Sequence, residues 1–180
     1  MLTDFLKTGS YDRRRDFVKT ISPSMDILVS SNFERMLYYL TDGDSERVGA
    51  WMAELATQGV YSIGDELLGR LRETFYGEFA TDDETRETIR TTWEEEHILI
   101  DPHTADGVKV ARELREAGET VVCLETALAA KFADTIREAV GDVDIPRPAK
   151  LQGLEDLPQK VQNVPNQAEA VKEIIRNVLN

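Results

Sequence analysis

The chain has 180 residues, 41% of them hydrophobic, which is enough for one medium domain with a buried core. Its 34 acidic and 21 basic residues give a net charge of −13, which argues against a nucleic-acid surface and against attraction to anionic lipid. One cysteine and two histidines exclude an internal disulfide and are too few for an ordinary zinc site. No apolar run has the length of a membrane span and no signal-peptide pattern is present, so we expect a soluble cytoplasmic protein.

The polar segment Ser22–Arg35 predicts a strand that runs directly into a helix. Met25 and the run Ile27–Val29 are apolar and suit a buried strand. Ser31, with Glu34 three residues later, has the spacing of a capping box, and apolar residues then recur at helical spacing. A strand that ends at an uncovered helix N-terminus is a natural place for an anion or polar ligand. An ordinary strand–helix joint is the alternative.

A series of helices is predicted in the next part of the chain. Apolar residues at helical spacing over 48–55 and 67–75 predict two of them, and Gly59 predicts the end of the first. Thr81 with Glu84 predicts a capping box at the start of a third, mostly polar helix. We therefore expect a helical insertion over about residues 44–96.

The segment that follows predicts a βαβ unit over about residues 97–140. Ile98–Ile100 and Val121–Leu124 are short apolar runs typical of buried strands, with a helical stripe between them that stops at Gly118. Alternating strands and helices imply an α/β fold, here a three-layer one with a parallel sheet and flanking helices, whose ligands bind beyond the carboxyl ends of the strands. Those ends carry three polar clusters, which are Ser30–Asn32, Asp101–Thr104 and Glu125–Thr126.

A proline-rich break separates residues 1–144 from the last part of the chain. Prolines at positions 146, 148, 158 and 165 exclude a long regular element there. Asn166 with Glu169 then predicts a final helix, whose apolar side must dock on this domain or on a partner. We expect an α/β domain over 1–144, and a Pro-rich segment with a C-terminal helix over 145–180.

Four motifs resemble, in the same order, segments of the threonine synthases, pyridoxal-phosphate enzymes of fold type II. They are Leu2–Asp12, Ser22–Arg35, Ile100–Ala105 and Glu125–Phe132. The resemblance implies part of the tryptophan synthase beta-like fold. The family's Schiff-base lysine, in its Phe-Lys-Asp context, and its phosphate-binding glycine loop do not appear in the sequence. The chain therefore resembles the C-terminal portion of a threonine synthase without the catalytic N-terminal portion, and we expect no catalytic residue and no metal site in it.

The resemblance implies contacts to pyridoxal phosphate and to a phosphorylated substrate in the full-length enzyme. Thr126 would hydrogen-bond the pyridine nitrogen of the cofactor, and a helix N-cap is its alternative role. Arg35 offers a planar fork of donors to a phosphate, and a salt bridge to a nearby carboxylate is an equal alternative. The candidate substrate-binding residues are Asp26, Ser30, Ser31, Asn32, Arg35, His103 and Thr104.

The function implied by the resemblance is the conversion of O-phosphohomoserine and water to threonine and phosphate. We expect this chain alone to be an inactive fragment that binds no cofactor, with the catalytic N-terminal half of the enzyme as its partner. The alternative is a natural, non-catalytic module derived from that fold, which binds a small ligand or a partner subunit. A separated half would expose an apolar face and could self-associate.

Overall fold

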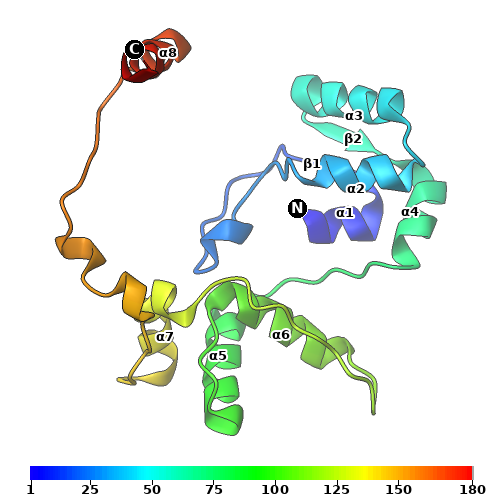
Figure 1. The fold of residues 1–180 in the computed structure, drawn as a ribbon. Helices are drawn as coiled ribbons and strands as arrows, with labels where there is room; N and C mark the ends of the chain where they lie inside the picture. The colour runs from blue at the N-terminus through cyan, green and yellow to red at the C-terminus, as the bar shows by residue number, and fades with distance from the viewer. Residues whose placement is uncertain (180) are drawn as a thin grey trace. The chain divides into compact units, whose positions relative to one another are not determined.

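The structure is a computed structural model that describes residues 1–179. The chain divides into two compact units, Met1–Pro146 and Arg147–Asn180. Helices make up most of the regular structure in the described residues, and the sheet found there has two short strands (Figure 1).

The first part of unit Met1–Pro146 is built around an antiparallel strand pair. Strand β1 (Ser10–Asp12) pairs with β2 (Val60–Ser62), and the register places Tyr11 opposite Tyr61. A two-stranded ribbon is marginal by itself, so it depends on the helices packed around it. These helices are α1 (Leu2–Thr8), α2 (Phe33–Leu40), α3 (Ser45–Gln58) and α4 (Gly64–Arg72).

An aromatic core holds the strand pair to its helices. Phe5 and Leu37 are fully buried, and the rings of Tyr11 and Tyr61 stack with their centroids 5.4 Å apart. Trp51 of α3 stacks on Tyr61 at 5.9 Å. Aromatic pairs contribute about 0.5–1.5 kcal/mol each beyond the area that they bury, so this stack stabilises a very small sheet.

The second part of this unit is helical. Helix α5 (Asp82–Glu96) packs against α6 (Pro102–Leu114) and α7 (Ala133–Val140). A single 3-10 turn, Ala129–Phe132, leads into α7. Ile89, Ile100, Ala105 and Ile136 form the buried core between these helices.

Helix α5 begins at the capping box that the sequence predicts, which confirms that prediction. Thr81 Oγ1 accepts the N–H of Glu84 at 3.3 Å, and the Glu84 carboxylate accepts the N–H of Thr81 at 2.7 Å. The hydrogen bonds from Thr81 lower the pKa of the Glu84 carboxyl. Helix α3 likewise ends at Gly59, whose φ of 80° is the left-handed conformation that glycine adopts without strain.

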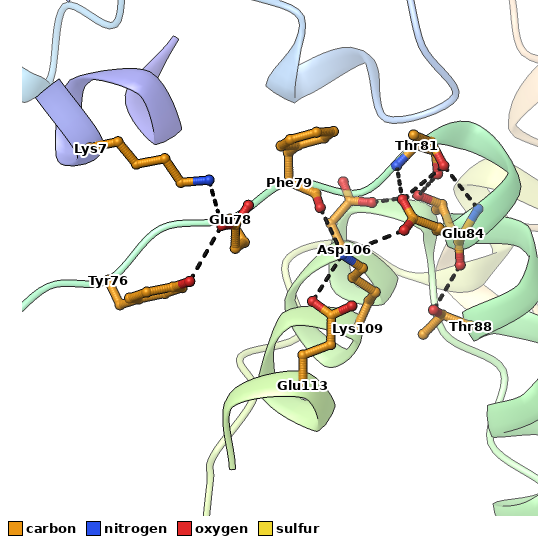
Figure 2. A network of polar contacts seen from close by, with 11 residues as sticks. Lys7, Tyr76, Glu78, Phe79, Thr81, Glu84, Thr88, Asp106, Lys109 and Glu113 are labelled. Carbon is orange, nitrogen blue, oxygen red and sulfur yellow. Dashed lines mark hydrogen bonds and ion pairs between the residues drawn. The ribbon is translucent and has the colours of Figure 1, made fainter. Parts of the chain in front are cut away.

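Two lysines hold the segment between α4 and α5. Lys7 Nζ lies 2.5 Å from Glu78 Oε1. Lys109 Nζ donates to the Phe79 carbonyl at 3.0 Å and also pairs with Glu113 at 2.9 Å (Figure 2). The segment is therefore anchored through its backbone and side chains, although it contains no helix or strand.

The predicted three-layer parallel sheet is not found in the described residues. The segments Ile98–Ile100 and Val121–Leu124 are not strands, and Pro23–Met25 is a 3-10 turn rather than the start of one. A strand needs a neighbour to pair with its N–H and C=O groups, and these segments do not pair with one another. Val122 is 79% exposed and Leu124 78%, so the second run is not buried as predicted.

The capping box predicted at Ser31 and Glu34 is also wrong. Helix α2 begins one residue later, with Asn32 at its N-cap and no side-chain capping bond. Ser31 lies instead in a turn before the helix, in which the Phe33 N–H donates to the Ser30 carbonyl at 3.1 Å. The Asn32 side-chain oxygen accepts from Ser30 Oγ at 2.6 Å rather than capping α2.

The second unit contains two 3-10 turns, Ala149–Leu151 and Leu154–Asp156, and helix α8 (Ala168–Leu179). Arg147 pairs with Glu155 through two hydrogen bonds, one of them 3.0 Å long. The final helix that the sequence predicts is confirmed, and none of its described residues is buried. Among the helices of residues 1–179, we find none with both the length and the apolar character needed to cross a membrane.

Candidate functional site

The D-P-H-T segment forms the first turn of helix α6. Asp101 is the N-cap, and its Oδ1 accepts the N–H of His103 at 3.0 Å. Pro102 follows in the first turn, where its missing N–H removes no helical hydrogen bond. Asp101 is fully buried, so an ionised carboxylate there needs hydrogen-bond donors on both oxygens.

His103 connects Asp101 to a segment far away in the sequence. His103 Nδ1 lies 2.9 Å from Asp101 Oδ1, and its Nε2 accepts the N–H of Ser24 at 3.0 Å. Because Nε2 is an acceptor, the ring proton is on Nδ1 and the ring donates it to Asp101. Ser24 lies in a 3-10 turn of the motif Ser22–Arg35, so this neutral imidazole joins two motifs through residues that are 79 positions apart.

Thr104 connects the same carboxylate to the motif Glu125–Phe132. Its Oγ1 donates to Asp101 Oδ2 and accepts the N–H of Thr126 at 3.2 Å. The ring of Phe132, in the same motif as Thr126, lies 4.8 Å from the His103 ring. Three of the four motifs therefore meet at one set of hydrogen bonds. We call it the Asp101 network; its members are Ser24, Asp101, His103, Thr104 and Thr126.

The side chain of Thr126 is exposed and does not cap a helix. The 3-10 turn that follows has Leu128 at its N-cap, with no side-chain capping bond. The N-cap alternative for Thr126 is therefore wrong. Within residues 1–179 the Thr126 hydroxyl has no hydrogen-bond partner, whereas its backbone N–H is held by Thr104. This arrangement leaves a neutral hydroxyl on a fixed backbone, free to bind a ligand.

A partly buried carboxyl, that of Asp106, lies one turn further along α6. Asp106 accepts a hydrogen bond from Thr85 Oγ1 at 2.7 Å, and its partial burial raises the pKa of the carboxyl. The Ser22 hydroxyl is buried near it but makes no hydrogen bond within normal geometry to any described residue. Ser22 is two residues from Ser24, and Asp106 is three residues from His103, so both lie beside the Asp101 network.

The remaining candidates lie outside the Asp101 network. Asp26 accepts hydrogen bonds from both the N–H and the hydroxyl of Thr20 at 2.7 Å, so its side chain stabilises the loop between these two residues. Ser30 donates its N–H to the Tyr11 hydroxyl at 2.7 Å. Arg35 is exposed and makes no salt bridge in the described part of the chain, so the predicted pairing to a carboxylate is not found. Ser31 and Asn32 are exposed next to the start of α2.

Two members of the network, Asp101 and Ser24, are not among the candidate substrate-binding residues, although the sequence places Asp101 in the polar cluster Asp101–Thr104. The Asp-Pro pair was a usable signal, because Asp before Pro is typical of an N-cap followed by the first helical residue. No comparable signal exists for Ser24, since its backbone N–H rather than its side chain makes the contact.

Comparison with known proteins explains the order of the motifs. A family model described as "Threonine synthase, C-terminal" matches residues 104–175. Threonine synthase from Corynebacterium glutamicum is 41% identical over 97% of this chain, and the one from Methylobacillus glycogenes is 38% identical over 97%. The chain matches the C-terminal part of the threonine synthases. It spans 37% and 38% of the length of these two relatives.

The backbone of this chain is also similar to that of solved threonine synthases. The PLP-bound threonine synthase from Brucella melitensis superposes with a TM-score of 0.85 and 37% identity, over 98% of this chain and 38% of that one. The yeast threonine synthase gives a TM-score of 0.83 and 34% identity, over 99% of this chain and 40% of that one. The resemblance predicted from the four motifs is therefore confirmed over nearly the whole chain, including the second unit.

Proposed function

We propose that this chain is the C-terminal part of a threonine synthase, which with pyridoxal phosphate converts O-phosphohomoserine and water to threonine and phosphate. The observation that carries the proposal is the Asp101 network, in which three of the motifs shared with that family are joined by hydrogen bonds. If each motif only stabilised its own segment, no hydrogen bonds between the motifs would be needed. The identity to threonine synthases over 97% of the chain supports the same conclusion.

Thr126 is the residue that we propose for the cofactor. Its hydroxyl is exposed and free of partners within the described residues, while its N–H is fixed by Thr104. Such a hydroxyl fits a ring nitrogen that remains unprotonated, because a neutral donor stabilises the neutral nitrogen whereas a carboxylate would stabilise its charged form. Pyridoxal phosphate, when bound, supplies the electron sink for the reaction.

Arg35, with Ser31 and Asn32, is the proposed contact for the substrate phosphate. The Arg35 guanidinium has no ion pair among residues 1–179, so its donors are available without breaking an existing bond. A guanidinium binds phosphate through two parallel hydrogen bonds. Ser31 and Asn32 lie at the start of helix α2, where the positive end of the helix dipole favours an anion.

The proposed partner is the N-terminal part of the enzyme. The relatives are more than twice as long as this chain, and in this proposal their remaining part supplies the cofactor lysine and the phosphate-binding glycine loop. The exposed apolar side chains of Val122 and Leu124 support the proposal, because such a run is costly to leave in water. Covering these two side chains would stabilise the assembly by roughly 2–4 kcal/mol.

The test is the activity of the full-length enzyme that contains this chain. We expect release of phosphate from O-phosphohomoserine that depends on added pyridoxal phosphate. Thr126→Val should lower this activity and change the absorbance of the bound cofactor. Thr135→Val is the matched control, because it is the same substitution at a partly buried threonine of α7 without side-chain hydrogen bonds among the described residues. Absence of cofactor-dependent phosphate release would contradict the proposal.

A further inference from the structure

Asp101 makes more contacts than a helix N-cap requires. An N-cap carboxylate needs to accept one backbone N–H of the first turn, and here that bond comes from His103 N. Asp101 accepts two more hydrogen bonds, from the His103 ring and from the Thr104 hydroxyl. Both extra donors come from side chains, and neither is needed to begin α6.

Each of these two side chains also accepts a hydrogen bond from the backbone of a distant segment. His103 Nε2 accepts the N–H of Ser24, and Thr104 Oγ1 accepts the N–H of Thr126. The direction of every hydrogen bond follows from the donors, because a backbone N–H can only donate and a carboxylate can only accept. The ring and the hydroxyl must therefore each donate to Asp101 and accept from the distant backbone.

We propose that Asp101 is a positioning residue that fixes the Ser24 turn through His103 and the backbone of Thr126 through Thr104. The His103 arm runs from Asp101 through His103 to Ser24, and the Thr104 arm runs from Asp101 through Thr104 to Thr126. The two arms act on different parts of the site. The His103 arm holds the loop that leads to Ser30–Asn32, and the Thr104 arm holds the residue assigned to the cofactor. The assignment of Thr126 to the cofactor rests on the proposed function, whereas the arrangement of the network does not.

The His103 arm is tested by a pair of amide substitutions in the cofactor-free chain. Gln places its amide oxygen near the position of Nε2, whereas Asn reaches only the position of Nδ1. We expect His103→Asn to release the Ser24 N–H and to speed its hydrogen exchange roughly five- to tenfold. His103→Gln should restore most of the protection. Equal exchange at Ser24 in both variants and in the parent chain would overturn this arm.

The Thr104 arm is tested by Thr104→Val and Thr104→Ser. Val removes the acceptor for the Thr126 N–H, so the exchange of that amide should rise roughly five- to tenfold, and Ser should restore it. Thr88→Val is the matched control, because Thr88 is equally buried and its hydroxyl bonds only the Glu84 carbonyl of its own helix. An unchanged Thr126 amide in Thr104→Val, or the same rise in Thr88→Val, would overturn the arm.

Kinetics of the full-length holoenzyme separate the two arms. His103→Asn should raise KM several-fold with little change in kcat, because the substrate loop loosens. Thr104→Val should lower kcat several-fold and shift the cofactor absorbance, with KM nearly unchanged. If the amides respond but the cofactor spectrum does not, the positioning role stands and the proposed assignment of Thr126 fails. If the amides do not respond, the positioning role fails whatever the spectrum shows.

Discussion

Removing the Tyr11 hydroxyl should destabilise the first unit while leaving its aromatic core in place. Tyr11 is 2% exposed, and its hydroxyl accepts the N–H of Ser30 at 2.7 Å. Tyr11→Phe keeps the ring that stacks on Tyr61 but leaves that N–H without an acceptor. A buried, unpaired N–H costs about 1–3 kcal/mol, and Ser30 at 9% exposure has little access to water. We therefore expect a loss of about 1–2 kcal/mol in the free energy of unfolding.

The assay is urea unfolding of the chain, monitored by fluorescence. The free energies of unfolding of the variants are compared at constant m-value. Tyr39→Phe is the control, because this tyrosine of α2 is 71% exposed and should change stability by less than about 0.5 kcal/mol. If Tyr11→Phe and Tyr39→Phe unfold at the same urea concentration, the hydrogen bond to Ser30 does not anchor this loop. Our account of how Ser30–Asn32 is held would then be refuted.

Three further substitutions test the packing, the backbone and the partly buried carboxyl of Asp106. Ile136→Ala should cost about 2–5 kcal/mol in urea unfolding, because its side chain is fully buried, whereas exposed Ile98→Ala should cost far less. Gly59→Ala should lower the melting temperature, because φ is 80° and the new Cβ would lie 2.6 Å from Arg14 Cγ. The raised pKa of Asp106 means that the folded state holds its proton more tightly than the unfolded state, so stability falls as pH rises above the usual carboxyl value of 3.8. Asp106→Asn should flatten that fall in a pH series of unfolding curves, and an unchanged slope would contradict it.

The helix boundaries that the sequence predicted correctly depend on neighbouring residues. The Thr81 and Glu84 capping box and the Gly59 stop both form within one turn, so the local sequence contains all the groups involved. The box predicted at Ser31 and Glu34 failed for a local reason too. Ser31 lies in a turn closed by the Phe33 N–H and the Ser30 carbonyl, so the N-cap position of the helix is Asn32.

The strands were predicted wrongly because a strand is not a local property. The runs Ile98–Ile100 and Val121–Leu124 have the composition of buried strands, yet neither finds a pairing partner in the described residues. The strands that do form, Ser10–Asp12 and Val60–Ser62, are short, and they pair across 50 residues of chain. Apolar composition alone does not determine which segments meet.

The sequence by itself revealed the resemblance to the threonine synthases, most of the helices and the polar residues from which a site could be built. The order of the motifs is enough to reveal the resemblance. Capping and helical periodicity depend on residues close together in the sequence, so they are enough to predict the helices. Only the tertiary structure decided that Ser24, Asp101 and Thr126 belong to one network. Its two contacts to distant segments use the backbone N–H groups of Ser24 and Thr126, which every non-proline residue carries, so no pattern of side chains could have revealed them.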